Sequence, residues 1–499
     1  MNLRTLFHAM TAATMVGVPL VDSFAPTSSK ATLPVTTTTK LYATSTNLNV
    51  AVVGGGPSGL LLTHLLLRDE NTRVTLLEGR DDPRIQGTEQ RAYALGVGIR
   101  GRTAIRQVDE ELWQAVKRRG YESERFQLHV GGLILPLRDG SDGVEPSLLT
   151  FQSELCAGLA EELDRRHGSS GRLLMKFGTR VKACDLNTMK IELDDSTALD
   201  SESFDLILGC DGVNSAVRTA MQESFPAFQS TREQLPGEFK VVRLSSVPPE
   251  VDPTAVSLIL PRKGTSGAFV EPTGNDRSCC ILFSGRGDTP ILRETKNITA
   301  VVEELEGAFP KWEGFYQEIA EQLMAQSVTG TASSVVCNTY NFGGKAALAG
   351  DAAHATGGVS GQGVNSALAD VVVLAQCIQE NRDNLAKGLL EYSCRQVPEG
   401  KALYDLSFGP KPKGLKAIRW ALRSARDTLF RGRFGIGRPP LQTRLTTELT
   451  SFADIRRETD EFYPEPFPPL EEFRTKLEDL QEQAVSSSDP SKAIIEAKR

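Results

Sequence analysis

A stretch in the second half of the chain combines small residues with a few polar side chains. It reads AALAGDAAHATGGVSGQGVNSALAD, from Ala346 to Asp370. Small residues let the backbone approach a flat or phosphorylated ligand, and Asp351 and Asn365 can hold such a ligand by hydrogen bonds. His354 has no second ligand at metal spacing, so we expect a packed, hydrogen-bonded histidine rather than an acid, a base or a metal ligand. A helix N-cap is the alternative role for Asp351, and the two glycine motifs earlier in the chain favour contact with a cofactor instead.

A second glycine cluster lies near the start of the chain, in LNVAVVGGGPSGLLLTHLLLRDENTRVTLLEGR. A β-branched run precedes the motif Gly54-x-Gly56-x-x-Gly59, an apolar helix follows it, and a second strand ends at Glu78. The glycines permit a tight turn close to a pyrophosphate, and an acid at this distance accepts hydrogen bonds from ribose hydroxyls. The order of these elements predicts a βαβ unit that binds a dinucleotide, and a glycine-rich turn without a ligand is the alternative.

Two further predicted strands end in an aspartate that is flanked by glycine. SFDLILGCDGVNSAVR leads through Asp211 into a helix that carries Arg218, and KAALAGD leads through Gly350 to Asp351. In an open parallel sheet the carboxyl ends of the strands meet at one edge, where ligands bind. We therefore expect the three motifs to line one site.

The elements that must position these motifs predict an α/β fold, with a Rossmann-like dinucleotide-binding domain in two pieces. We assign residues 48–235 and 331–385 to that domain. Residues 236–330 alternate polar and apolar residues between Pro, Gly, Asn and Asp, which predicts an inserted, mainly antiparallel β domain over the substrate. Residues 386–475 are predicted to be a helical C-terminal region, and residues 476–499 a disordered tail.

One helix of the C-terminal region has a basic side. The segment GLKAIRWALRSARDTLF places Leu415, Ile418 and Leu422 at helical intervals. Lys416, Arg419, Arg423 and Arg426 fall on the other side. We expect the apolar side to pack on the domain and the basic side to face water. A helix on a membrane surface, and hence peripheral membrane contact, is the alternative.

Composition excludes several classes of function. The chain has 499 residues, of which 40% are hydrophobic and 24% charged, as in ordinary globular proteins. A formal net charge of -7 and the lack of a nucleic-acid motif argue against nucleic acid as a partner. The eight cysteines form no CxxC pair and the five histidines are dispersed, so we expect reduced, buried thiols and no metal site. No stretch is apolar enough for a transmembrane anchor, and the sequence does not indicate an oligomeric state.

Residues 1–47 have the composition of a two-part targeting segment. The apolar run TLFHAMTAATMVGVPLV follows Arg4, as in a signal peptide. From Ser23 to Asn49 the chain is rich in Ser and Thr and has no acid, as in a transit peptide. This arrangement resembles the presequences of algae with secondary plastids and predicts a plastid protein. A mitochondrial location and an extension without targeting value are the alternatives.

Together the three motifs resemble those of the FAD-dependent aromatic monooxygenases with the p-hydroxybenzoate hydroxylase-like fold. They are GxGxxG, GCDGxxSxxR and GDAAHA followed by GQGxN, and the resemblance covers Leu48 to Tyr463. Within this family, RAYALGVGIRGRTAI, GAFVEPTGNDRSCCILF, SVVCNTYNF and VPEGKALYDLS resemble segments of the kynurenine 3-monooxygenases. The chain differs from those enzymes at residues 92–94 (AYA), 358–360 (GVS) and 408–411 (FGPK).

The resemblance implies bound FAD, a transient NADPH or NADH, O2, and a small aromatic substrate hydroxylated through a flavin C4a-hydroperoxide. It implies that the cofactor is held by Gly54, Gly56, Ser58, Gly59, Glu78, Arg80, Gln152, Val181, Asp211, Arg218, Gly350, Asp351, Gly361, Gln362, Gly363 and Asn365. It makes Arg91 and Asn365 the candidate catalytic residues. For Arg91, a structural salt bridge is the alternative.

Two other functions stay open. A plastid flavin epoxidase of a carotenoid or other isoprenoid would suit the targeting segment and the basic helix. A flavin-binding protein without turnover would suit the replacement of a proline by Gly358.

Overall fold

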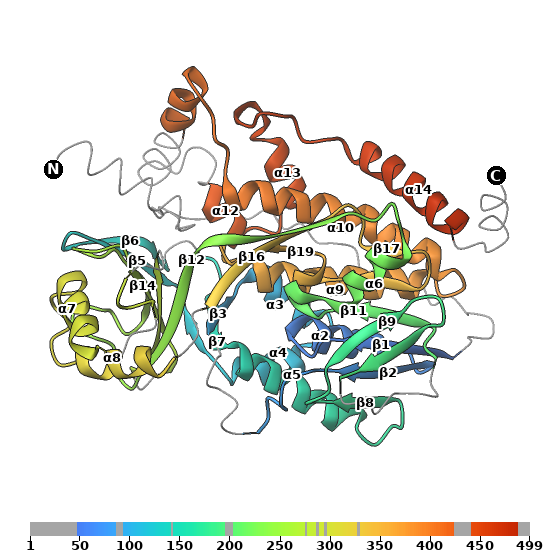
Figure 1. Cartoon of the computed structure of the whole chain (residues 1–499), viewed down its shortest axis with the longest axis horizontal. Coiled ribbons are helices and arrows are strands. Elements are labelled where there is room, and N and C mark those ends of the chain that lie inside the picture. The colour runs from blue at the N-terminus through green and yellow to red at the C-terminus, as the bar shows by residue number, and fades with distance from the viewer. Residues whose placement is uncertain are drawn as a thin grey trace.

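Two lobes joined by one long strand are visible in the computed structural model of the chain (Figure 1). The structure describes residues 47–85, 93–140, 143–194, 203–274, 277–285, 289–293, 297–326, 330–423 and 441–487. The larger lobe is built on a six-stranded sheet and the smaller one on most of an eight-stranded sheet. This arrangement confirms the predicted α/β fold, with a Rossmann-like domain, a mainly antiparallel β unit and C-terminal helices.

Strand β1 (Leu48–Val53) lies inside the six-stranded sheet because its apolar residues are buried on both faces. It pairs in parallel with β2 on one side and with β11 on the other. The remaining order is β17-β18-β11-β1-β2-β8, with β2 at Thr72–Leu77, β8 at Leu173–Lys176, β11 at Leu206–Gly209, β17 at Asn341–Phe342 and β18 at Ala346–Leu348. The carboxyl ends of β1, β11 and β18 therefore meet at one edge, as the sequence predicts.

Helix α2 (Pro57–Leu66) is buried along its whole length, which explains why its sequence is apolar all round rather than amphipathic. It packs against α5 (Gln152–His167) and α9 (Gly363–Glu380). Helix α6 (Ala216–Ser224), which follows the motif at Asp211, packs against β11 and against β9 (Val181–Asp185). Strand β9 forms a hairpin with β10 (Lys190–Leu193).

The eight-stranded sheet has the order β19-β16-β12-β15-β14-β13-β5-β6. These strands are β5 at Arg125–Val130, β6 at Leu133–Asp139, β12 at Ser230–Leu244, β13 at Ala255–Ile259, β14 at Gly267–Pro272, β15 at Cys279–Gly285, β16 at Gly330–Cys337 and β19 at His354–Thr356. Helices α7 (Ile298–Ala308) and α8 (Tyr316–Ala325) cover one face and form a separate apolar core with it. The sheet thus extends beyond the segment 236–330, because β5 and β6 join it through a parallel pair with β13.

A small sheet connects the lobes. Its strands are β3 at Ala94–Val97, β4 at Tyr121–Ser123 and β7 at Ser147–Phe151, in the order β3-β7-β4. Helices α3 (Ile99–Arg106) and α4 (Glu110–Lys117) follow β3, and α3 packs against α9. Strand β3 is thereby fixed next to the glycine-rich loop that precedes α9.

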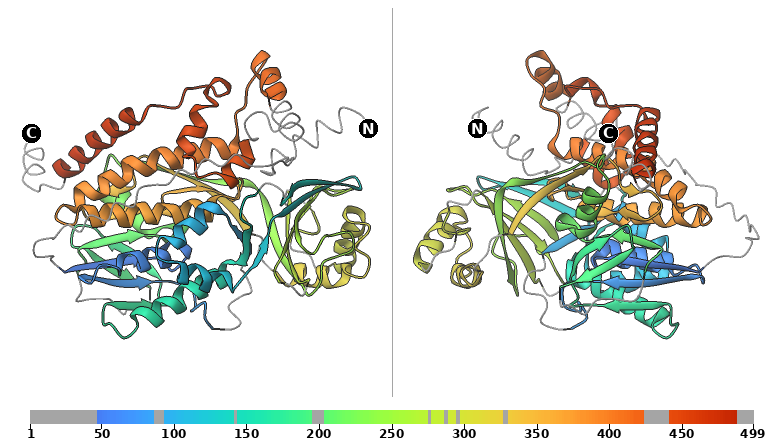
Figure 2. Two further views of the ribbon diagram at one scale, coloured as in Figure 1. Left: turned by 180° about the vertical axis from the view of Figure 1, so that it is seen from behind. Right: turned by 45° about the vertical axis from the view of Figure 1, so that its right-hand side comes forward.

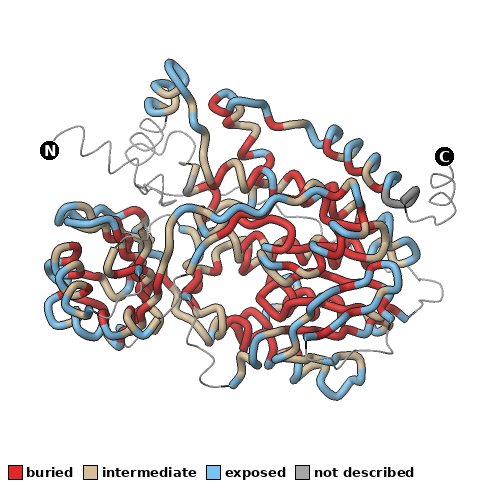
Figure 3. Tube along the Cα trace, in the orientation of Figure 1, coloured by how far each residue is buried: buried red, intermediate tan, exposed pale blue. Residues whose placement is uncertain are grey.

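The C-terminal helices lie over the larger lobe (Figure 2), and exposed and buried residues alternate along the last of them (Figure 3). They are α10 at Leu385–Phe408, α12 at Leu441–Thr447, α13 at Phe452–Arg457 and α14 at Leu470–Ser487. The prediction of a disordered tail from residue 476 is wrong in its first part, because α14 continues to Ser487. Phe473, Leu477 and Gln481 recur at helical spacing and are buried, which holds the helix in place.

The predicted packing of the basic helix is also wrong. Residues 415–423 are helical, but Leu415, Ile418 and Leu422 are 79%, 58% and 65% exposed. The helix is held instead by its other side, where Arg419 binds Glu461 at 2.9 Å. Trp420 contacts Phe462 on the same side, so aromatic and ionic contacts outweigh the aliphatic face. Arg426 lies outside the described residues.

Other expectations concern what the fold contains. All eight cysteines are buried and unpaired, which confirms the prediction of buried thiols. Within the described ranges, no group of three or more His, Cys, Asp or Glu side chains is placed to hold a metal ion. No helix in that part of the chain is both long and apolar enough to cross a bilayer. The targeting segment, residues 1–47, lies outside the described residues except for Asn47.

Candidate functional site

The turn between β1 and α2 can only be built from glycine at two positions. Gly54 has φ +103°, and a Cβ there would lie 2.3 Å from the carbonyl oxygen of Cys210. A Cβ at Gly59 would lie 1.9 Å from the carbonyl oxygen of Gly54. A Cβ at Gly56, in contrast, would meet nothing closer than 3.8 Å. Gly54 and Gly59 therefore bring β1, α2 and the second motif together, while Gly56 leaves its surroundings open to a ligand.

Glu78, at the end of β2, is buried beside this turn. Its Oε2 accepts the N–H of Gly55 at 2.7 Å, and its Oε1 accepts the N–H of Arg80 at 2.7 Å. The guanidinium of Arg80 also binds both oxygens, at 3.0 and 3.3 Å. Burial raises the pKa of Glu78, but the hydrogen bonds from Arg80 and Gly55 outweigh it and leave the pKa below its usual value. The carboxylate is thus charged and oriented toward the glycine turn, and Arg80 must move before Glu78 can accept a ribose hydroxyl.

The second motif serves first to join elements. The Oδ2 of Asp211 accepts the N–H of Ala216 at 2.7 Å and so caps α6, whereas its Oδ1 is buried without a partner. Burial raises the pKa of Asp211 despite these hydrogen bonds. The buried side chain of Arg218 donates to the carbonyl oxygen of Ala352 at 2.9 Å and so reaches the third motif. The side chain of Arg218 therefore links the second motif to the third.

The third motif turns at Gly350, which has φ +60° and lies near Ser58 of the first motif. The N–H of Gly350 donates to Oδ2 of Asp370 at 3.1 Å, and the ring of His354 binds the same oxygen at 2.7 Å. Burial lowers the pKa of His354, but the Asp370 carboxylate outweighs it and raises the pKa above its usual value. The prediction of a packed, hydrogen-bonded His354 is confirmed.

Asp351 stands apart from its neighbours because its surface is exposed while Gly350 and Ala352 are buried. Protein atoms still surround the carboxylate on its other sides, and this desolvation raises its pKa. No hydrogen bond to the Asp351 side chain occurs among the described residues, and Asp351 lies three residues after the end of β18. Its carboxylate is therefore presented to whatever the site binds, which a helix N-cap would not be.

Asn365 ties the glycine-rich loop to β3. Its Oδ1 accepts the N–H of Gly98 at 2.8 Å, and its Nδ2 donates to the carbonyl oxygen of Gly96 at 3.0 Å. The side chain is buried and its amide is occupied by these backbone contacts. Gly361 has φ +65°, and Gln362 and Gly363 then begin α9. Asn365 therefore positions the loop through these backbone contacts and does not act by direct contact with a substrate.

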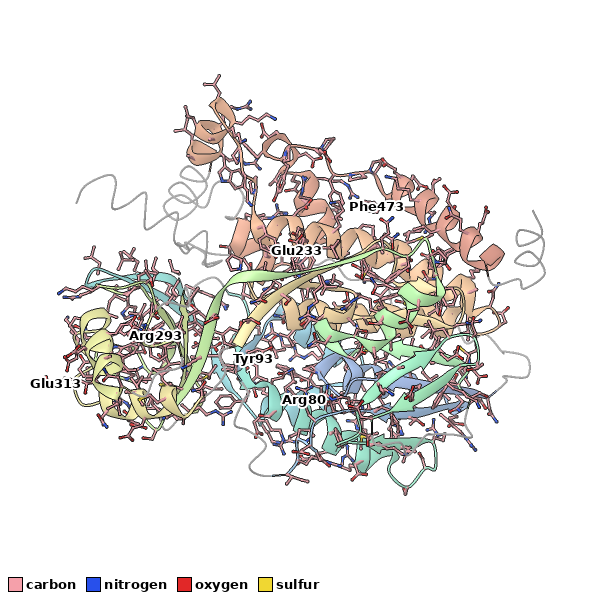
Figure 4. The ribbon with its side chains drawn as sticks, viewed as in Figure 1. Arg80, Tyr93, Glu233, Arg293, Glu313 and Phe473 are labelled. Atoms are coloured by element: carbon pink, nitrogen blue, oxygen red, sulfur yellow. The ribbon has the colours of Figure 1, made fainter. Side chains whose placement is uncertain are left out.

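Tyr93 is a site residue that the sequence motifs do not indicate. It lies between the two lobes, near Arg80 (Figure 4). Burial raises the pKa of Tyr93 to about 12, and the charge of Asp351 contributes while that of Arg80 opposes it. The side chain is nevertheless 40% exposed, so it lines the surface that Arg80 and Asp351 share. The only sequence signal was the difference from the kynurenine 3-monooxygenases at residues 92–94.

Three predicted residues have weaker or no support from the geometry. The N–H of Gln152 donates to the carbonyl oxygen of Tyr93 at 3.3 Å, which places it at the site. Val181 opens β9, after a loop whose Thr179 N–H donates to the carbonyl oxygen of Glu78. Arg91 lies outside the described residues.

The arrangement suits a dinucleotide. Helices α2 and α9 pack against each other, and neither has a side-chain cap at its N-terminus. Their first N–H groups are therefore available to a diphosphate, and the helix dipoles favour its charge. The space around Gly56, the exposed carboxylate of Asp351 and the unpaired Oδ1 of Asp211 add acceptors and close backbone approach. These residues fit FAD.

Comparison with known proteins agrees with this geometry. Residues 47–406 match the family described as "FAD binding domain". The chain is 27% identical over 383 residues to a kynurenine 3-monooxygenase of Stenotrophomonas maltophilia, covering 72% of this chain and 78% of the relative. It is 25% identical over 371 residues to that of Sus scrofa, covering 72% and 74%.

Solved structures share the fold. The tetrameric form of 2-methyl-3-hydroxypyridine-5-carboxylic acid oxygenase superposes with a TM-score of 0.59 at 18% identity, over 80% of this chain and 96% of that one. PqsL of Pseudomonas aeruginosa, in complex with 2-aminobenzoylacetate, gives a TM-score of 0.54 at 19% identity, over 72% and 94%. The chain therefore belongs to the FAD binding domain family and is an FAD-dependent monooxygenase.

Proposed function

We propose that the protein hydroxylates a small aromatic substrate with O2, using NADPH or NADH as the reductant. The observation that carries this proposal is the convergence of the three motifs beneath β3, where the second sheet faces the FAD domain. Kynurenine is the first substrate to test, because the relatives at 25% to 29% identity are kynurenine 3-monooxygenases.

The residues of the chain would bind and orient rather than react. When bound, FAD supplies the electron transfer from the nicotinamide and the activation of O2. Gly54 and the start of α2 would hold the diphosphate of FAD, and the exposed carboxylate of Asp351 would accept hydrogen bonds from its hydroxyl groups. Asn365 fixes β3 against the loop at Gly361, so the floor of the site keeps its shape. The eight-stranded sheet would cover the substrate and limit the access of water to it.

The test uses the purified protein loaded with FAD. NADPH or NADH consumption is followed with kynurenine and a panel of phenols and anilines, together with the mass of each product. The proposal predicts an aromatic compound that speeds flavin reduction at least tenfold and gains one oxygen atom. If no aromatic compound does either, the proposal is wrong.

A second candidate is an epoxidase of a membrane-dissolved isoprenoid, and the exposed side chains of Leu415, Ile418 and Leu422 favour it. They would place the protein against a bilayer that holds such a substrate. Xanthophyll in liposomes would then be converted to an epoxide by the FAD-loaded enzyme and NADPH. An unchanged xanthophyll, with an aromatic hydroxylated in parallel, would decide for the first candidate.

We further propose that residues 1–47 direct the protein to a plastid. The apolar run and the acid-free, Ser- and Thr-rich stretch support this location. A fluorescent protein fused behind residues 1–47 and expressed in an alga with a secondary plastid should enter that organelle. Fluorescence in mitochondria or in the cytosol would contradict the proposal.

A further inference from the structure

Glu271 in β14 is a buried carboxylic acid without a partner. It is 6% exposed, and among the described residues no side chain or backbone group forms a hydrogen bond or ion pair with it. Burial raises its pKa to about 7, and no nearby cation offsets this effect. Burying a carboxyl group without a partner destabilises the folded protein. Such groups are typical of sites that bind a ligand.

The direction of Glu271 follows from the alternation of β14. Ala268 and Val270 lie in the core under α7 and α8. Because side chains alternate along a strand, Phe269 and Glu271 lie on the opposite face of the sheet. On that face Glu271 is opposite Cys280 of β15, which in turn is opposite Arg243 of β12. The three side chains form a row across three neighbouring strands.

This row faces the FAD domain. The backbone of Ala94 in β3 interacts with the thiol of Cys280. The guanidinium of Arg243 lies 4.0 Å from the ring centre of Phe151, at the end of β7. Strand β3 begins directly after Tyr93 and continues to Gly96, where Asn365 binds it. Glu271 is therefore buried between the two sheets, on the side that leads to the loop at the flavin site.

We propose that Glu271 recognises the substrate and selects aromatic compounds that carry a cationic amino group. The proposal rests on the aromatic hydroxylase function above and adds a substrate class to it. An ammonium group supplies the charge and the hydrogen-bond donor that the carboxylate lacks, whereas an anionic substituent would be repelled. Phe269 and Cys280 share the sheet face with Glu271 and carry no positive charge. The cation on this face, Arg243, lies two strands away from Glu271 and stacks on the ring of Phe151.

The experiment measures binding to the FAD-loaded protein from the change in flavin absorbance. Three phenols of similar size serve as probes, namely tyramine (cationic), 4-ethylphenol (neutral) and 3-(4-hydroxyphenyl)propionate (anionic). The wild-type protein is expected to bind tyramine about tenfold more tightly than 4-ethylphenol, because a charge-assisted hydrogen bond is formed. The propionate is expected to bind most weakly.

The variant Glu271→Gln keeps the shape of the side chain and removes its charge. It should lose about tenfold in tyramine affinity and less than about twofold in 4-ethylphenol affinity. Glu233→Gln, an exposed carboxylate on β12, is the matched control and should bind all three probes like the wild type. The proposal is wrong if the wild-type protein does not prefer tyramine, or if Glu271→Gln keeps the preference.

Two features keep the result interpretable. The wild-type preference needs no variant, so the proposal can be overturned even if Glu271→Gln folds poorly. Binding needs only bound FAD, whereas the proposed function is tested by NADPH-driven flavin reduction on the same samples. If NADPH does not reduce the flavin but tyramine is still preferred, the hydroxylase function is wrong and the carboxylate site remains. If the flavin is reduced but tyramine is not preferred, the carboxylate site is wrong and the hydroxylase function remains.

Discussion

Individual residues carry the electrostatics of the cofactor site, and the pair of Glu78 and Arg80 is the first to test. Hydrogen bonds from Arg80 hold the pKa of Glu78 below its usual value. The stability that this pair contributes is therefore present above the usual pKa of glutamate and is lost as the pH falls through the lower folded value. Arg80→Ala should raise the pKa of Glu78, so acid unfolding should begin at a higher pH than in the wild type.

The measurement is the acid midpoint of unfolding by circular dichroism, with Arg73→Ala as the control. Arg73 is an exposed residue of the neighbouring β2 that should leave the midpoint unchanged. Equal midpoints for the wild type and Arg80→Ala would show that Arg80 does not hold the charge of Glu78.

The buried pair of His354 and Asp370 has the opposite pH dependence. Because Asp370 raises the pKa of His354, its stabilisation is full below the usual pKa of histidine and is lost as the pH rises through the raised value. Asp370→Asn should remove this dependence and cost about 3 kcal/mol, since the buried histidine loses its charged partner, whereas the amide oxygen can still accept the N–H of Gly350. Thermal unfolding of FAD-free protein from pH 5.5 to 9 measures both effects.

Asp383→Asn, at an exposed carboxylate after α9, is the control for that series. A variant of Asp370 with the same melting temperature as this control at every pH would contradict the role assigned to the pair.

At the scale of elements, the glycine turn gives a prediction that separates folding from cofactor binding. Gly54→Ala and Gly59→Ala place a Cβ against backbone oxygens at 2.3 and 1.9 Å. Each should destabilise the FAD-free protein by about 2 to 4 kcal/mol, through a clash and, at Gly54, a positive φ. Gly56→Ala, with free space around it, should change that stability by less than about 1 kcal/mol and weaken FAD binding instead.

Urea unfolding of the FAD-free variants and FAD titration by fluorescence quenching measure the two effects. If Gly56→Ala is as unstable as the other two, the turn has a purely structural role.

Elements defined by local patterns were predictable, and those defined by distant pairing were not. The turn at Gly54 could be predicted because strand, glycines, helix and acid lie within one short segment. The addition of β5 to the second sheet could not, because it depends on pairing Phe126 with Val256. The exposed face of Leu415 escaped prediction for a related reason, since helical spacing does not tell which side finds a partner.

At the scale of the site, residue types were predicted better than roles. The motifs predicted that Asp351 and Asn365 hold the ligand, but whether the carboxylate or the amide is free to do so depends on contacts with residues far along the chain. The amide of Asn365 forms hydrogen bonds with the backbone of Gly96 and Gly98, whereas the carboxylate of Asp351 accepts none from the described residues. The burial of Glu271 could not be predicted from the sequence, because a carboxyl group in an alternating strand is normally exposed.

At the scale of the whole molecule, one strand joins the lobes into a cooperative unit. Strand β12 pairs with β16 through Ser230–Gln234 and again at Glu238 and Phe239, and it pairs with β15 through Glu238–Leu244. The register shifts between Gln234 and Glu238, where the sequence has Pro236 and Gly237. Since the same strand carries the ladders on both sides of this shift, the lobes cannot separate without breaking hydrogen bonds.

The strand order of the six-stranded sheet determines when the protein can fold during synthesis. Strand β11 needs β18 at its edge, and the ribosome must translate from Gly209 to Ala346 before that partner exists. At usual rates this takes on the order of ten seconds, during which an apolar strand edge is open to chaperones or to aggregation. Ribosome-bound chains stalled at residue 300 should be fully digested by protease, and chains stalled beyond α10 should yield a protected fragment. Protection at residue 300 would mean that the first strands fold without β18.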